Sequence, residues 1–213
     1  MDDLTFSDPK STITLLIGSS DPPIEMVVHQ EAACAGSPVL RAAFCGNFME
    51  GRTKTYRLAH VDEATARLLV QWLYAGKIVT IQLKEDWKYD PKDTEIMIAE
   101  HNSLVDLWVL ADELQMPTLQ DCAVTTLFQI QRKTRNRLNW SWQRVYRKTS
   151  ESSKLRLYIC HLCALQIRPT SYSYYKDFIP YEMLMDIAQT LSDGLFRNGK
   201  LDLKLSDYLV EEG

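Results

Sequence analysis

The sequence predicts an α+β fold, in which a small β-sheet with short helices is followed by helices alone. Two observations carry this prediction. Apolar and polar residues alternate near the N-terminus, as in half-buried strands, and beyond residue 103 the apolar residues recur every three or four positions, as in helices. With 213 residues, 46% of them hydrophobic, the chain is long enough to bury the core of one domain or of two small ones.

A β-hairpin is predicted first. Ile13, Leu15 and Ile17 alternate with less apolar positions, and the alternation resumes at Ile24 and continues to Val28. The intervening residues 18–23, GSSDPP, contain a glycine and two prolines. These residues indicate a connection wider than a two-residue turn.

Two short helices are predicted next, instead of one long helix. Residues 30–35 can form barely two turns before Gly36 stops them. Ser37 can then accept a hydrogen bond from an orphan amide of a second helix, and Pro38 suits its first position because no N–H is needed there. We therefore expect the two helices to meet at an angle.

The following segment predicts a strand, a helix, another strand and a loop. Residues 55–58 are the first strand, and Asp62 caps a helix with a broad apolar stripe that Gly76 ends. Residues 79–83 alternate again, which predicts a strand. Residues 84–95, KEDWKYDPKDTE, are charged and turn-prone, which predicts a surface loop.

The remainder of the chain is expected to be helical. Ser103 and Asp106 resemble a capping arrangement at the start of the first of these helices, and Pro117 separates it from the second. Apolar residues at helical spacing mark the four helices, over residues 104–114, 117–130, 155–165 and 183–191.

The net charge of -4 conceals a basic stretch between Arg132 and Arg156, where nine Lys and Arg face one acid, Glu151. Such a stretch could follow a phosphate backbone. No nucleic-acid fold signature accompanies it, so a solvated helix face and loop is the favoured interpretation and no nucleic-acid partner is expected.

The cysteines and histidines indicate neither a disulfide framework nor a catalytic or metal site. The five cysteines are odd in number and unevenly spaced. Cys160 and Cys163 lie one helical turn apart beside His161, but a structural zinc site needs four ligands and no second pair accompanies them. His29, His60 and His101 stand in no nucleophile–base pattern. We expect no enzyme, no cofactor and no metal.

The sequence predicts no targeting to a membrane or to the exterior. The first ten residues carry acids and no apolar run, so no secretory signal is expected, and no later stretch approaches the length of a membrane span. A cytoplasmic or nuclear protein is the resulting expectation.

Five landmarks in this order resemble the BTB/POZ family. They are the hairpin TITLLIG and IEMVVH, His29, SPVLRAAF, QWLYAGKI (71–78) and LWVLADELQMPTLQDCAV (107–124). The resemblance covers roughly residues 12–131. Residues 145–165 and the helix after them resemble the C-terminal extension of many fungal BTB proteins. This implies a BTB/POZ domain over residues 1–133 and an all-helical C-terminal extension over residues 134–213.

The resemblance implies a protein–protein interaction module, often a homodimer. In many members it is an adaptor that binds cullin-3 and presents a substrate protein to a ubiquitin ligase. Cullin-binding members carry a hydrophobic-x-Glu element after the second short helix, where this chain has Phe48, Met49 and Glu50. The alternative is a local role, in which Phe48 covers the core, Met49 fills space and Glu50 is solvated. A homo-oligomerising structural or transcriptional scaffold without cullin binding stays open as the second function.

Overall fold

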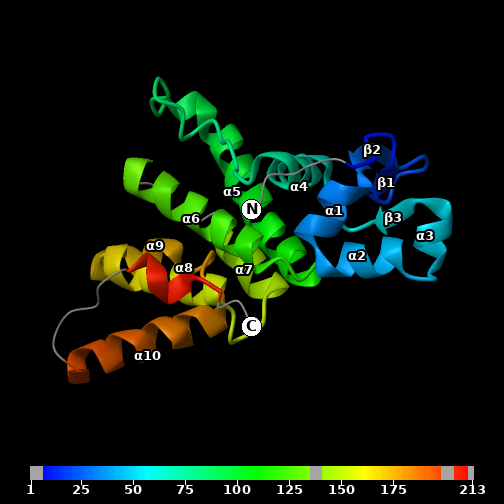
Figure 1. Cartoon of the computed structure of the whole chain (residues 1–213). Coiled ribbons are helices and arrows are strands. Elements are labelled where there is room, and N and C mark those ends of the chain that lie inside the picture. The colour runs from blue at the N-terminus through cyan, green and yellow to red at the C-terminus, as the bar shows by residue number, and fades with distance from the viewer. Residues whose placement is uncertain (1–6, 135–140, 198–203, 211–213) are drawn as a thin grey trace. The chain divides into compact units, whose positions relative to one another are not determined.

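A computed structural model describes residues 7–134, 141–197 and 204–210 (Figure 1). The fold is α+β, as predicted, with a small mixed sheet and many helices. The chain forms two compact units. The first contains Met1–Val79 and Asp106–Cys122, and the second contains Thr80–Val105 and Ala123–Gly213. The expected domain boundary between residues 133 and 134 stays a prediction.

The sheet of the first unit has the order β2-β1-β3 (Figure 1). Strands β1 (Thr12–Ile17) and β2 (Ile24–His29) form the predicted hairpin, with antiparallel pairing. Strand β3 (Thr55–Leu58), also predicted, pairs with β1 in parallel, so that Leu15 lies opposite Tyr56. The alternation of β1 places three side chains in the core: Ile13, Leu15 and Ile17.

The break between the first two helices is confirmed. Helix α1 (Gln30–Gly36) ends before Ser37, and α2 (Pro38–Cys45) begins with proline at its first position. The Ser37 hydroxyl accepts a hydrogen bond from the Leu40 N–H at 3.1 Å, as an N-cap does. A single helical turn, α3 (Met49–Thr53), follows.

Helix α4 (Glu63–Ala75) has both predicted ends. The Asp62 carboxylate accepts a hydrogen bond from the Thr65 N–H at 2.8 Å. Gly76 ends the helix at φ 62°, a left-handed conformation that glycine adopts without steric cost. The apolar stripe is buried through Leu69, Trp72 and Leu73.

The prediction of a helix starting at Ser103 is wrong. Helix α5 spans Thr94–Glu113, so Ser103 is buried within it, and neither Ser103 nor Asp106 lies near a helix start. A 3-10 turn, η1 (Pro91–Asp93), leads into α5. The apolar stripe of residues 104–114 is buried as expected, and α6 (Pro117–Thr134) begins at proline after a very short turn, also as expected.

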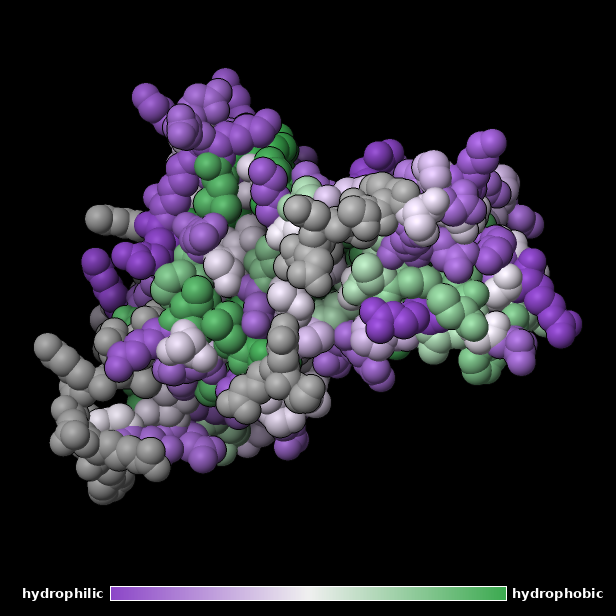
Figure 2. All heavy atoms as spheres, in the orientation of Figure 1, coloured by the Kyte–Doolittle hydropathy of each residue, from purple (hydrophilic) through white to green (hydrophobic). Residues whose placement is uncertain are grey.

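The predicted strand over residues 79–83 is also wrong, since residues 78–90 form turns and irregular backbone. The physical reason is the side chain of Glu100. Its carboxylate accepts hydrogen bonds from the backbone N–H groups of Ile81 and Gln82, so these amides are not available to a sheet. The loop predicted over residues 84–95 ends earlier, at η1. Hydrophilic residues gather around this loop in Figure 2.

The second unit also contains α7 (Trp142–Lys148) and the predicted helices α8 (Lys154–Gln166) and α10 (Tyr181–Arg197). Helices α8 and α10 pack together, with Cys160 Sγ 3.4 Å from Thr190 Oγ1. Three short elements complete the described part of this unit: η3 (Pro169–Ser171), α9 (Tyr172–Tyr175) and η4 (Leu205–Tyr208). No helix in the described ranges is both long and apolar enough to cross a membrane.

Candidate protein-interaction surface

The junction of α2 and α3 holds the three residues that the sequence singled out for partner binding. Phe48 occupies the N-cap position of α3, while Met49 and Glu50 form its first turn. Lys54 ends the turn, and its backbone N–H donates to the Glu50 carbonyl at 2.8 Å. The Thr53 hydroxyl donates to the Met49 carbonyl at 3.1 Å. The backbone under the three residues is therefore held by local hydrogen bonds.

Two glycines let α3 lie close against the end of α2. A Cβ on Gly51 would stand 3.0 Å from the Gly46 carbonyl oxygen, so the two backbones pass within near contact. A Cβ on Gly46 would stand 2.9 Å from Cδ2 of Phe48, which means that the Phe48 ring lies against this glycine. Small residues at these positions thus fix the place from which the aromatic ring projects.

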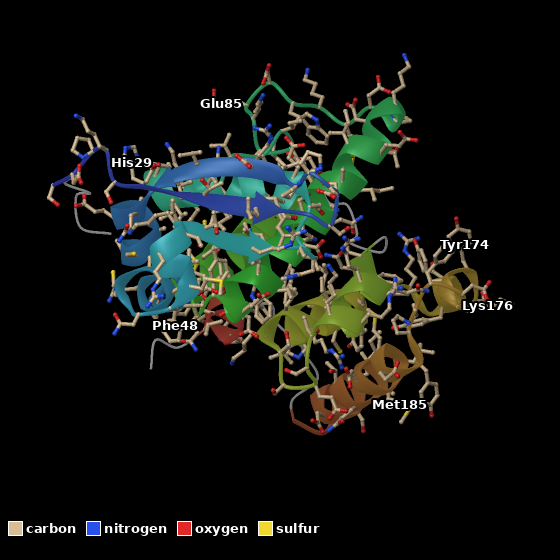
Figure 3. The ribbon with its side chains drawn as sticks, turned by 90° about the vertical axis from the view of Figure 1, so that its right-hand side faces the viewer. His29, Phe48, Glu85, Tyr174, Lys176 and Met185 are labelled. Carbon is tan, nitrogen blue, oxygen red and sulfur yellow. The ribbon has the colours of Figure 1, made fainter. Side chains whose placement is uncertain are left out.

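The apolar side chains of this junction are largely open to solvent. Phe48 is 60% exposed and Met49 is 74% exposed, whereas Glu50 is half-buried. Phe48 lies at the periphery of the first unit, beside α2 and α3 and away from the β1–β2 hairpin (Figure 3). The local interpretation, in which Phe48 covers the core, stays open, although the side chain of Phe48 is far more exposed than that of the core residue Phe44, which is 4% exposed.

Two acids, Glu50 and Glu113, lie near the ring of Tyr56. Burial raises the pKa of the Tyr56 phenol, and the neighbouring carboxylates of Glu113 and then Glu50 raise it further. Both carboxylates therefore lie within electrostatic range of one ring. Glu113 also meets His60, whose Nε2 is 2.8 Å from its Oε2 at the surface. We call Phe48, Met49, Glu50, Tyr56 and Glu113 the junction surface.

The junction surface has the composition of a docking site. Exposed aromatic and methionine side chains are enriched at protein interfaces, and carboxylates at their margin select basic groups on a partner. Within the described residues, no group of three or more His, Cys, Asp or Glu side chains could hold a metal ion.

Sequence reasoning missed Tyr56, His60 and Glu113. Tyr56 stood in a predicted strand, and Glu113 at the end of a predicted helix, so neither pattern indicated that they would meet. Only the packing of the end of α5 near β3 brings them together. The local patterns that predict elements carry no signal for such a contact between distant segments.

One residue of the basic stretch, Arg156, has a structural role in the second unit. The Arg156 guanidinium lies over the Tyr146 ring, 4.6 Å from its centroid, and donates to the carbonyls of Tyr146 and Thr149 at 2.5 Å each. A cleft of about 480 Å³ adjoins it and is lined by both Arg147 and the acid Glu151. Residues 135–140 of the stretch lie outside the described residues.

The cysteine and histidine side chains of residues 160–163 pack against other parts of the second unit. Cys160 and Cys163 are each only 3% exposed. The Nδ1 of His161 lies 3.0 Å from the Tyr208 hydroxyl, and burial lowers the pKa of this imidazole. The imidazole of His161 therefore has a protein partner in η4.

The sequence matches no protein-family model, and no curated protein is significantly similar to it.

Proposed function

We propose that the first unit is a BTB/POZ-type protein-interaction module whose junction surface binds a partner protein, with cullin-3 as the most concrete partner. The observation that carries the proposal is the exposure of Phe48 and Met49 on a backbone turn held against α2. Such side chains lose little backbone freedom when a partner covers them, because the turn is already formed.

The order of elements supports the family within this proposal. A hairpin, two short helices separated by Ser37 and Pro38, a further strand and α4 follow one another as the resemblance implies. The hydrophobic-x-Glu element falls after the second of these helices, at Phe48 to Glu50. In an adaptor, the second unit would recruit the substrate protein.

Charge supports a partner with basic groups. Glu50 and Glu113 lie near the same phenol, and the interface would place their carboxylates at its margin. Phe48 would fill an apolar pocket of the partner, while Glu50 would accept hydrogen bonds from a lysine or arginine.

The test is a binding measurement with purified cullin-3 and the full chain. Phe48→Ala and Glu50→Lys are each expected to weaken binding tenfold or more, about 1.4 kcal/mol or above. Phe178→Ala is the matched control, because Phe178 is a similarly exposed phenylalanine (55%) in the second unit. If the three variants and the unchanged chain bind alike, or if none binds, the adaptor function fails.

A homo-oligomerising scaffold is the second candidate, and the edge position of β2 favours it. Strand β2 pairs only with β1 in the described sheet and carries the exposed Val27. A free strand edge can pair with another copy of the chain. Mass measurement in solution separates the two candidates: a stable homodimer without affinity for cullin-3 supports the scaffold, and a monomer that binds cullin-3 contradicts it.

A further inference from the structure

We propose that Cys34 and Cys45 are a modification site, at which a hydroperoxide oxidises the two thiols to an intramolecular disulfide. Cys34 belongs to α1, and Cys45 is the last residue of α2. Their Sγ atoms lie 3.9 Å apart, although the residues belong to different helices. A disulfide holds its sulfur atoms about 2.05 Å apart, so a movement of roughly 2 Å closes the bond.

The two thiols differ in accessibility, which assigns their roles. Cys45 is exposed and can meet a dissolved oxidant, whereas Cys34 is buried. Burial and the neighbouring Cys45 raise the pKa of the Cys34 thiol to about 11, with Arg41 and Lys54 acting in the opposite direction. Cys34 is thus shielded from direct oxidation and is placed to react only with its neighbour.

The reaction balances in two steps. The Cys45 thiolate takes one oxygen from the hydroperoxide: the O–O bond breaks, an S–O bond forms, and water or an alcohol leaves. The Cys34 sulfur then attacks the Cys45 sulfur, so that the S–S bond forms and the S–O bond breaks. The departing hydroxide and the proton of Cys34 leave as water. Proximity rather than acidity drives this second step, since the attacking thiol is already in place.

Two other cysteines, Cys160 and Cys163, are less suited to this chemistry. Cys160 and Cys163 are buried in α8, and Cys160 Sγ lies near the Thr190 hydroxyl. An oxidant in solution meets Cys45 more readily than either of them.

The bond would tie the end of α2 to α1 just before Gly46. It would therefore restrain residues 46–48, from which the Phe48 side chain projects. An oxidant would then control the affinity of the junction surface. This consequence rests on the proposed function, but the disulfide itself does not.

The test uses the reduced full chain, treated with hydrogen peroxide, alkylated and digested with trypsin without reductant. Arg41 separates the two cysteines, so a disulfide joins two tryptic peptides, residues 11–41 and 42–52. We expect this linked species in mass spectra, two hydrogens lighter than the separate peptides together, and its loss on reduction. Cys45→Ser and Cys34→Ser should each abolish it, while Cys122→Ser should retain it.

Two results would overturn the site. One is oxidation of Cys45 to sulfinic acid with no linked peptide, and the other is a disulfide found only between chains. Cys34→Ser adds an independent check, because Cys45 should then accumulate as a sulfenic acid that dimedone traps. If the linked species forms but cullin-3 binds the oxidised and reduced chains alike, control of the interface fails and the modification site stands.

Discussion

The hydroxyl of Ser37 donates a hydrogen bond to the backbone carbonyl of Leu114 at 2.7 Å while it accepts one from the Leu40 N–H. The side chain is fully buried. Ser37 therefore caps α2 and also binds the turn that follows α5. These two segments are far apart in the sequence. The break between α1 and α2 is thus a structural joint of the first unit.

Replacing Ser37 by alanine should lower the free energy of unfolding by about 1–3 kcal/mol, because a buried N–H and a buried carbonyl each lose a partner. Denaturant titration measures this change. Ser19→Ala, at an exposed position in the hairpin loop, is the control and should stay within about 0.5 kcal/mol. Equal stability of the two variants would show that the Ser37 hydroxyl has no such role.

Two glycine substitutions should act in opposite directions. A Cβ on Gly46 would stand 2.6 Å from the Ala42 carbonyl oxygen, a backbone atom that cannot turn aside. Gly46→Ala should therefore cost about 1–3 kcal/mol and displace the Phe48 ring. Gly194 lies within α10 with no atom within 4 Å of its added Cβ, so Gly194→Ala should stabilise by about 0.5–1 kcal/mol.

Thermal unfolding compares the two glycine variants, and a stabilising Gly46→Ala would contradict the close packing at the junction. Binding of cullin-3 by folded Gly46→Ala reports separately on the position of Phe48.

Arg156→Lys should destabilise the protein by about 1–3 kcal/mol. Lysine retains the charge but has no planar guanidinium. It therefore cannot stack on the Tyr146 ring and at the same time donate several hydrogen bonds to the end of α7. Arg147→Lys is the matched control, since Arg147 is exposed and donates one hydrogen bond to the Gln143 carbonyl. Denaturant titration decides, and equal effects of both changes would refute a structural role specific to Arg156.

The buried His101 should make stability depend on pH. Neither of its ring nitrogens has a hydrogen-bond partner among the described residues, and burial lowers the pKa of this imidazole to about 4. In the unfolded chain it protonates near pH 6.5, so the unfolded state binds the extra proton between these values. The contribution of His101 to the free energy of unfolding is therefore at its maximum above about pH 6.5. It falls as pH drops toward 4, by up to roughly 3 kcal/mol.

Denaturant titrations between pH 7 and pH 4 measure that slope. His101→Leu removes the titrating group and should flatten the dependence of the free energy of unfolding on pH. At pH 7 the variant should lose no stability, because leucine leaves no ring nitrogen buried without a partner. Ser19→Ala, at an exposed position without a titrating group, should keep the slope of the unchanged chain. Identical slopes for the unchanged chain and His101→Leu would exclude His101 as the origin.

Local features were predictable because each depends on a few neighbouring residues. The alternation of Ile13, Leu15 and Ile17 predicted a strand with one buried face, which the structure has. The caps at Ser37 and Asp62 were predictable for the same reason, as their hydrogen bonds span only three residues. The sequence also pointed to Phe48, Met49 and Glu50 through the order of landmarks, and their role in binding stays a prediction.

Residues 79–83 show the limit of such reasoning. Their alternation is that of a strand, but a strand needs a partner with free backbone groups. Glu100 instead accepts hydrogen bonds from the backbone N–H groups of Ile81 and Gln82. It belongs to α5, which begins well before the predicted start. The pattern could not show this competition, because the competing group comes from another element.

The sequence by itself determined where α2, α4 and α6 begin and where α1 and α4 end, since caps, prolines and glycines act on the backbone within a turn of their own position. Tertiary structure decided which distant groups meet: Ser37 with Leu114, Cys34 with Cys45, and Tyr56 with the carboxylates of Glu50 and Glu113. The physical reason is that such contacts depend on how whole faces of helices and strands pack, and packing is the sum of many weak interactions that no single short pattern records.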